Sequence, residues 1–255
     1  MTVLAAPLQT STFLAPTFLD DLTPASGLAL RRWTPAEFRR MAFPAVFEPE
    51  ERLELVEGQI VLRGLGLPRL FSREEYYRLA ERGILTPDER TELIYGRIIK
   101  RMSPMGRPHS VTVSKTAAAL AAAFSDGYAV EQQVSMQLGS GLEPLPDVMV
   151  LPGIFDDYAD APLASDVLLL VEVSHTTLRY DRRTKAAMYA TEAIPDYWLV
   201  NLRARTLEVR RQPESGEYLS LSVYHEGEAV APLAVPDAPV RVADLLPIVR
   251  PRMKE

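Results

Sequence analysis

The chain has 255 residues, of which 47% are hydrophobic and 24% charged, a composition typical of a folded globular protein rather than a disordered or fibrous one. Its 34 acidic residues outnumber 28 lysines and arginines, so the formal net charge is −6 and any nucleic-acid contact needs a local basic face. The sequence contains no cysteine, which excludes disulfides and thiolate sites, and no apolar run approaches the roughly 20 residues that span a membrane.

The N-terminal stretch 1–30 lacks the basic start and continuous apolar centre of a signal peptide, and prolines interrupt it. We therefore expect residues 1–30 to be a loosely ordered N-terminal segment. We also expect a cytoplasmic protein with no membrane partner.

Two consecutive stretches of the chain resemble each other. Residues 33–63 aligned with 71–101 give 11 identical pairs in 31 without a gap, whereas chance would give about two. Each stretch starts with Thr34 or Ser72 at capping-box spacing before a glutamate, and each ends in a glycine-centred hairpin. The pattern predicts a duplicated helix–hairpin module, with an accessory first repeat over 31–68 and a main domain over 69–255.

From His109 onward the periodicity predicts a helix, three strands, a second helix and a further strand. The expected strands cover 128–138, 147–153, 166–174 and 197–201, the second helix runs from about 181 to 192, and a hairpin covers 206–225. The helical crossover makes the last two of the four strands parallel neighbours or near neighbours. The predicted fold class is therefore α/β with a mixed sheet.

Glu172 lies inside the apolar run VLLLVEV, where an isolated carboxylate costs several kcal/mol unless it is paired, protonated or bound to a cation. Asp147 begins the preceding strand, so two neighbouring strands could offer carboxylates to Mg²⁺ or Mn²⁺. Lys185 and Tyr189 are four residues apart on the next helix and would share one face. Each residue alone has an ordinary structural explanation, and the cluster is what indicates a site.

Four segments, TELIYGRI, SPMGRPH, PLPDVMVL and LLLVEVSHTTLRYDRRTKAAMYATEAIPDYWLV, occur in this order. In order and spacing they resemble the Uma family of putative restriction endonucleases, within the PD-(D/E)XK nuclease superfamily, over about residues 71–211. The resemblance implies a restriction-endonuclease-like αβββαβ core with a mixed central sheet flanked by helices. This agrees with the order of elements predicted above, and it makes 69–255 an endonuclease-like domain.

The resemblance also implies roles for single residues. Asp147 and Glu172 match the two superfamily acids that hold Mg²⁺, and Glu92 matches a hairpin glutamate that would complete the acidic set as an extra ligand. The superfamily lysine would stand at Ser174, and the family similarity moves it to Lys185 on the following helix. His109 matches the histidine after the family's SP segment and would lie near the substrate.

Phosphodiester cleavage gives these groups their expected chemistry. A metal held by Asp147 and Glu172 would lower the pKa of a water molecule and offset charge on the phosphorane, while Lys185 orients the water. Arg179, Arg182 and Arg183 are expected to bind substrate phosphates, the alternative being a solvated basic helix start.

The first repeat carries Glu54 where the second carries Glu92, yet no PD strand follows it directly. We therefore expect Glu54 not to be catalytic. The first repeat is expected to pack beside the nuclease core as a lid, a dimer element or a substrate-contacting arm, and a homodimer is left open.

The sequence thus predicts a Mg²⁺-dependent endodeoxyribonuclease. The acidic net charge and the lack of a sequence-reading module leave an alternative, a catalytically silent nucleic-acid-binding or regulatory protein on a nuclease scaffold. The intact set of Asp147, Glu172 and Lys185 favours the nuclease. A hydrolase that uses Ser174 and His175 is disfavoured because adjacent strand residues point to opposite faces.

Overall fold

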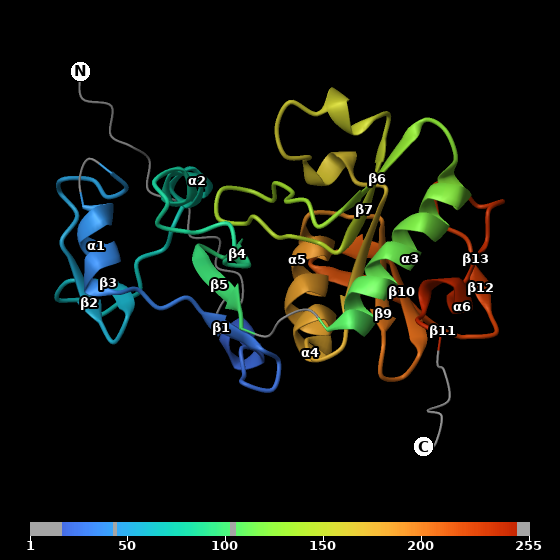
Figure 1. Ribbon diagram of the computed structural model, residues 1–255, viewed down its shortest axis with the longest axis horizontal. Helices are drawn as coiled ribbons and strands as arrows, with labels where there is room; N and C mark the ends of the chain where they lie inside the picture. Colours follow the sequence, from blue (N-terminus) through green and yellow to red (C-terminus); the bar gives the residue numbers. More distant parts are fainter. Residues whose placement is uncertain (1–16, 43–44, 103–105, 249–255) are drawn as a thin grey trace, which may run out of the picture.

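The computed structural model describes residues 17–42, 45–102 and 106–248, and its largest element is a six-stranded sheet with the order β11-β10-β9-β8-β7-β6 (Figure 1). The β8–β9 pair is parallel, whereas the other neighbours are antiparallel. The strands are β6 (Tyr128–Gln132), β7 (Val148–Pro152), β8 (Leu169–Ser174), β9 (Asp196–Asn201), β10 (Thr206–Glu214) and β11 (Glu217–His225). The predicted mixed sheet is confirmed.

Helices cover both faces of this sheet. One core cluster joins Trp198 and Val200 of β9 to α3 (Arg107–Phe124) and α6 (Val242–Leu245), and the other joins Tyr197 and Leu199 to the opposite helical layer. That layer is a continuous run of α4 (Leu178–Tyr180), the π-helical segment η4 (Asp181–Lys185) and α5 (Ala186–Thr191). Strand alternation on β9 thus sends bulky side chains into two cores, and the predicted αβββαβ order is confirmed.

Short elements complete this domain and its edges. They are η2 (Phe155–Asp157), η3 (Ala164–Asp166), β12 (Ala229–Val230) and β13 (Val240–Arg241). Within the residues that the structure describes, no helix combines the length and apolar character needed to cross a bilayer.

The strand predicted over 128–138 is wrong in its second half. β6 ends at Gln132, and Gln133 takes a positive φ of 55° that turns the chain out of the strand. Met136 and Leu138 nevertheless stay fully buried in the core. The alternating pattern therefore predicted the buried positions correctly, but a packed loop can bury alternate residues as well as a strand can.

Residues 17–30 are better ordered than the sequence indicates. They contain η1 (Thr17–Asp21) and β1 (Leu28–Leu30), and β1 pairs with β5 in a three-stranded sheet of order β1-β5-β4. Phe18 and Leu28 are buried in the core. The expectation of loose order is thus wrong for this part, and residues 1–16 lie outside the described residues.

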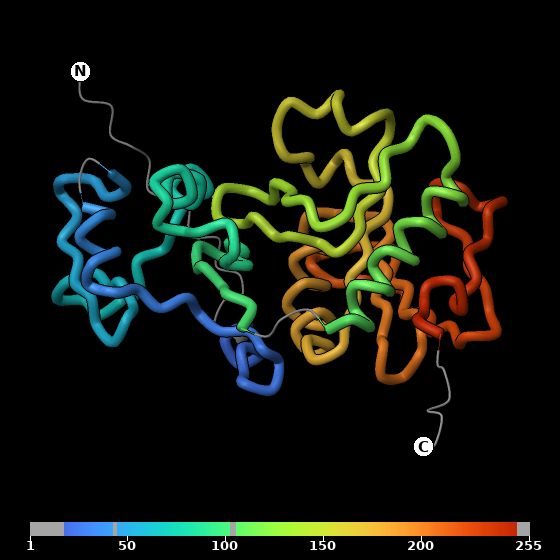
Figure 2. The backbone as a smooth tube through the Cα atoms, viewed as in Figure 1, coloured from blue at the N-terminus to red at the C-terminus, as the bar shows by residue number. Residues whose placement is uncertain are grey.

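Two helix–hairpin segments lie beside the large sheet. The first module, residues 31–68, contains α1 (Pro35–Met41), β2 (Leu53–Val56) and β3 (Gln59–Leu62), and the second module, residues 69–101, contains α2 (Arg73–Glu81), β4 (Thr91–Ile94) and β5 (Arg97–Arg101). Both helices begin with a complete capping box, as predicted. The second module lies between the first module and the large sheet (Figures 1 and 2). That the two modules are copies of one unit stays a prediction.

The β4–β5 turn supplies a stability test. Gly96 has a φ of +71°, and a Cβ there would lie 2.7 Å from the Cβ of Leu70, whereas Gly139 has a φ of +60° with nothing within 4 Å. Both Gly→Ala changes carry backbone strain of about 1–2 kcal/mol, and Gly96→Ala adds a steric clash costing about 1–3 kcal/mol. Urea unfolding should show the larger loss for Gly96→Ala, and equal losses would contradict this packing.

Candidate active site

Glu172 is the centre of a buried polar cluster. It lies on β8, whose residues are all buried, and is itself 2% exposed. Its Oε1 accepts hydrogen bonds from Lys185 Nζ at 2.8 Å and from the Tyr189 hydroxyl at 2.7 Å. The two donors are one helical turn apart, so the helix facing β8 supplies both. The buried Glu172 carboxyl group is therefore compensated by the Lys185 ammonium and the Tyr189 phenol.

Asp147 stands beside Glu172 on the neighbouring strand. It directly precedes β7, and the pairing of Val148 with Val171 brings the two acids next to each other. Its Oδ2 accepts the backbone N–H of Val173 at 2.8 Å and lies 3.2 Å from His109 Nε2 on α3. Burial alone would raise the pKa of Asp147, but the contacts with His109 and the charge of nearby Arg101 hold it below its usual value. This carboxylate is ionised.

Lys185 links the sheet to the second module. Its Nζ lies 3.2 Å from Oε1 of Glu92 on β4 as well as 2.8 Å from Glu172. Burial lowers the pKa of Lys185, but the surrounding carboxylates of Glu172, Glu92 and Asp181 outweigh it, so the pKa is raised and the ammonium stays charged. Four of the predicted site residues, Asp147, Glu172, Lys185 and Glu92, therefore converge, and His109 joins them through Asp147.

Asp181 adds a further buried acid to the cluster. It belongs to the π-helical segment, and its Oδ2 accepts a hydrogen bond from Thr177 Oγ1 at 2.5 Å. Burial raises the pKa of Asp181 to about 6, and Lys185 opposes this rise. The Asp181 carboxyl group is therefore partly protonated just below neutral pH.

Arg101 and Tyr180, which the sequence interpretation missed, are among the residues that line a cavity of about 30 Å³ with Glu92 and Asp147. Arg101 ends β5 and shares a strand face with Ile99, which pairs with Glu92, so alternation could have identified it. The Tyr180 hydroxyl is buried and has no hydrogen-bond partner among the described residues. A tyrosine in an apolar helix face is usually a core residue, so no sequence signal distinguishes it.

The three arginines expected to bind phosphate lie elsewhere. Arg179 Nε is 2.8 Å from Asp21 Oδ1, and Arg183 is 3.7 Å from the same oxygen, while Arg182 Nε donates to Glu208 on β10 at 2.9 Å. None of the three lines the cavity beside Asp147. Acidic partners already hold all three side chains, and their role with substrate stays a prediction.

The cluster carries more acids than cations. The carboxyl groups of Asp147, Glu172, Glu92 and Asp181 all act electrostatically on the Arg101 guanidinium, and Lys185 is the other permanent cation. No group of three or more His, Asp or Glu side chains with metal-binding geometry occurs in residues 17–42, 45–102 and 106–248. The arrangement suits a cation that takes one or two carboxylates and completes its shell with water or phosphate, as Mg²⁺ does.

Comparisons with known proteins agree with this fold. The model of the Uma2 family, described as a putative restriction endonuclease, matches residues 73–243. A crystal structure of a putative nuclease belonging to DUF820 from Anabaena variabilis ATCC 29413 is similar, with a TM-score of 0.51 and 18% identity, over 69% of this chain and 97% of that one. At this identity the similarity shows the fold alone. No curated protein matches the chain.

The buried Glu172 carboxyl predicts a pH-dependent stability for the metal-free protein. Burial, opposed only in part by Lys185, raises the pKa of Glu172 from 4.5 to about 8. The folded state therefore keeps a proton that the unfolded chain releases, and the free energy of unfolding should fall as pH rises through this interval, by at most about 1.4 kcal/mol per pH unit. Urea unfolding in EDTA across the interval measures the slope.

The variant E172Q cannot titrate at this position and should lose the contribution. D181N, whose parent carboxyl has a pKa of about 6, should change only the lower part of the curve. Identical slopes for wild type and E172Q would contradict the protonated state of Glu172.

Proposed function

The chain belongs to the Uma2 family of putative restriction endonucleases, as the sequence predicts, and from this membership we propose a metal-dependent endonuclease that hydrolyses phosphodiester bonds of DNA. One observation carries the proposal: Asp147 and Glu172 come from neighbouring strands and share a buried cluster with the Lys185 ammonium. A buried ion pair contributes little to stability compared with an apolar replacement of the same size. The cluster is therefore better explained by chemistry than by folding.

The donor set fits Mg²⁺ or Mn²⁺. Asp147 and Glu92 line a cavity of about 30 Å³, the space of a single water molecule or ion. Tyr180, whose buried hydroxyl has no hydrogen-bond partner among the described residues, lines it as well. We assign the ion to Asp147 and Glu172, with Glu92 as a further or water-mediated ligand. A bound Mg²⁺ supplies Lewis-acid stabilisation of phosphate charge and lowers the pKa of water.

The protein's own groups orient the reactants. The Lys185 ammonium has one N–H donor left beyond those to Glu172 and Glu92 and can hold the attacking water by donating to its oxygen. The water loses a proton to solvent as its oxygen attacks phosphorus, and the leaving oxygen takes up a proton as its bond to phosphorus breaks. The same ammonium charge stabilises the pentavalent transition state of this step. His109 lies 3.2 Å from the Asp147 carboxylate, so we assign it the role of positioning that carboxylate.

We assign the scissile phosphate to Arg101, which lines the cavity together with Arg90. It lines the same cavity as Asp147 and Glu92, and burial limits its freedom. A guanidinium binds phosphate oxygens in a bidentate manner. Arg179 and Arg183, which are more than half exposed, are left for phosphates farther along the strand. DNA is proposed as substrate because the family description names restriction endonucleases.

Cleavage assays test the proposal. Purified protein should nick or cut supercoiled and linear DNA with Mg²⁺ or Mn²⁺ and not with EDTA, and single-stranded DNA and RNA define the substrate class. E172A and K185A should each lower the rate at least about 100-fold, because each removes transition-state stabilisation. E92Q is compared with E54Q as its matched control, because Glu54 is the first-module counterpart of Glu92 and should be dispensable for cleavage.

Equal cleavage by wild type, E172A and K185A would point to a contaminating nuclease and contradict the site. DNA binding without cleavage in either metal would instead support a silent binding protein on a nuclease scaffold.

Arg101 has its own test. R101Q should lower cleavage by about 10-fold to 100-fold while leaving the fold intact, because a charge-assisted phosphate contact contributes roughly 1.5–3 kcal/mol. The control is R63Q, because Arg63 occupies the aligned position in the first module and lies outside the cavity. Equal rates for R101Q and R63Q would remove Arg101 from the site.

A further inference from the structure

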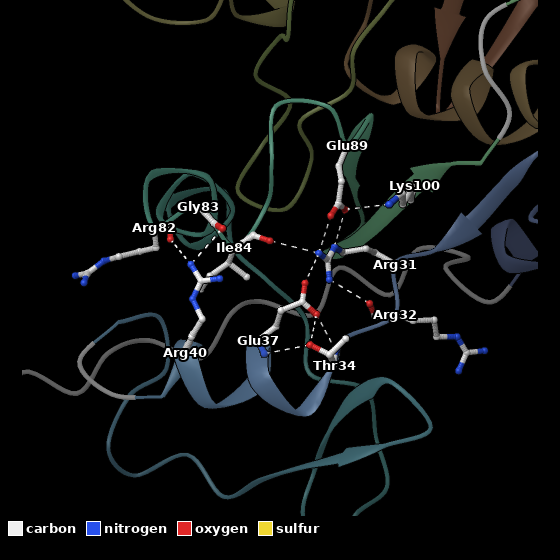
Figure 3. A network of polar contacts seen from close by, with 10 residues as sticks. All are labelled: Arg31, Arg32, Thr34, Glu37, Arg40, Arg82, Gly83, Ile84, Glu89 and Lys100. Carbon is white, nitrogen blue, oxygen red and sulfur yellow. Dashed lines mark hydrogen bonds and ion pairs between the residues drawn. The ribbon is translucent and has the colours of Figure 1, made fainter.

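A buried arginine joins the two modules. The Arg31 side chain is 6% exposed as a residue and stacks on Trp33, with its guanidinium carbon 4.2 Å from the ring centre. It donates to Glu37 of its own module at 2.6 Å and, twice at 2.9 Å, to Glu89 of the second module. It also donates to the backbone carbonyls of Ile84 in the second module and of Arg32 in its own module (Figure 3).

A second arginine makes the reciprocal contacts. Arg69, which aligns with Arg31, lies 5.2 Å from the ring centre of Phe71 and pairs with Glu75 of its own module. It also donates to Glu51 of the first module at 2.8 and 2.9 Å. In the alignment of the two modules, these glutamates are the counterparts of the two that hold Arg31. The two modules therefore exchange the same contacts in both directions.

Backbone hydrogen bonds and aromatic rings at aligned positions also form reciprocal contacts between the two modules. Arg31 N–H donates to the carbonyl of Ile98 at 2.8 Å, and Arg69 N–H donates to that of Ile60 at 2.9 Å. Trp33 and Phe71, which occupy aligned positions, face each other with ring centres 5.7 Å apart. A pseudo-two-fold axis thus passes between these rings.

The apolar core between the modules is built from aligned pairs. Ten of its twelve buried residues form such pairs, namely Trp33 with Phe71, Met41 with Leu79, Val46 with Ile84, Phe47 with Leu85 and Ile60 with Ile98. Each module therefore contributes nearly the same set of apolar side chains to the interface as the module it contacts. A surface with this property is complementary to another copy of itself.

The two modules differ in what covers their outer faces. The second module holds the large domain through backbone bonds of Leu93 with Glu143 and of Gly96 with Gly141. The aligned face of the first module is open, since Val56 is 47% exposed whereas the aligned Ile94 is 0% exposed.

We propose that the surface of the second module covered by the first module is a self-complementary docking surface for another copy of this chain. The first module occupies the place of that copy's second module. When it is displaced, Arg69 of each copy pairs with Glu89 of the other. The direct linkage between modules gives the intrachain contact a high effective concentration, so it prevails in the unaltered protein.

The full-length variant R31Q/E51R tests this. Both changes lie in the first module, where they remove the pair with Glu89 and place a second guanidinium opposite Arg69, while the second module keeps its native surface. Sedimentation velocity over a concentration series should show mass rising from 28.4 kDa toward twice that value, beyond any association of the wild type. Adding E89R should abolish the gain, because the docking surfaces of the two copies would then set guanidinium against guanidinium.

D126R, added to R31Q/E51R in place of E89R, is the matched control. Asp126 is exposed and lies outside both modules, so reversing its charge should leave the dimer unchanged. Circular dichroism melts run beside each variant. If R31Q/E51R fails to fold, E51R alone, which keeps the Arg31–Glu37 pair, replaces it with the same additions. A folded but loosened variant with the wild-type mass, a dimer that survives E89R, or aggregation beyond a dimer would each overturn the proposal.

Discussion

The burial of one carboxylate constrains most of this structure. Glu172 lies in the middle of a strand covered on both faces, where water cannot solvate it. Its donors, Lys185 and Tyr189, come from the helix that crosses back over the sheet, which fixes how that helix lies on β8. Lys185 in turn contacts Glu92, which fixes the second module against the sheet. A single buried carboxyl group thus couples three parts of the chain.

The helix that supplies these donors is irregular where it carries them. Asp181 and Lys185 bound a π-helical segment between two short α-helical turns. Such segments are rare and occur frequently at functional sites, because tertiary contacts must outweigh their poorer local geometry. Here the contacts are the buried bonds from the Tyr197 hydroxyl to the Asp181 carbonyl and from Lys185 to Glu172. The irregular segment is therefore a consequence of the polar cluster, and no signal in the local sequence indicates it.

The sequence predicted what depends on burial and failed where conformation has several solutions. An acid inside VLLLVEV must be paired, protonated or bound to a cation, so burial singled out Glu172, and the family resemblance indicated Lys185. Strand and helix periods were enough for the αβββαβ order. The end of β6 could not be predicted, because the buried Met136 and Leu138 fit a strand or a packed loop equally well. The phosphate-binding role expected of Arg182 followed from charge alone, and its partner Glu208 is distant in the sequence, on β10.

The hairpin β4–β5 connects the site to the first module. On one face, Glu92 and Arg101 border the cavity. On the other face, the cross-strand pair of Leu93 and Ile98 is buried in the core between the modules. Because strand side chains alternate, the two faces cannot move independently. The family match begins at Arg73, after the first module, yet in this chain that module buries the reverse side of a hairpin that carries two residues of the proposed site. Whatever fills this surface, the first module or a second copy, therefore also holds Glu92 and Arg101 in place.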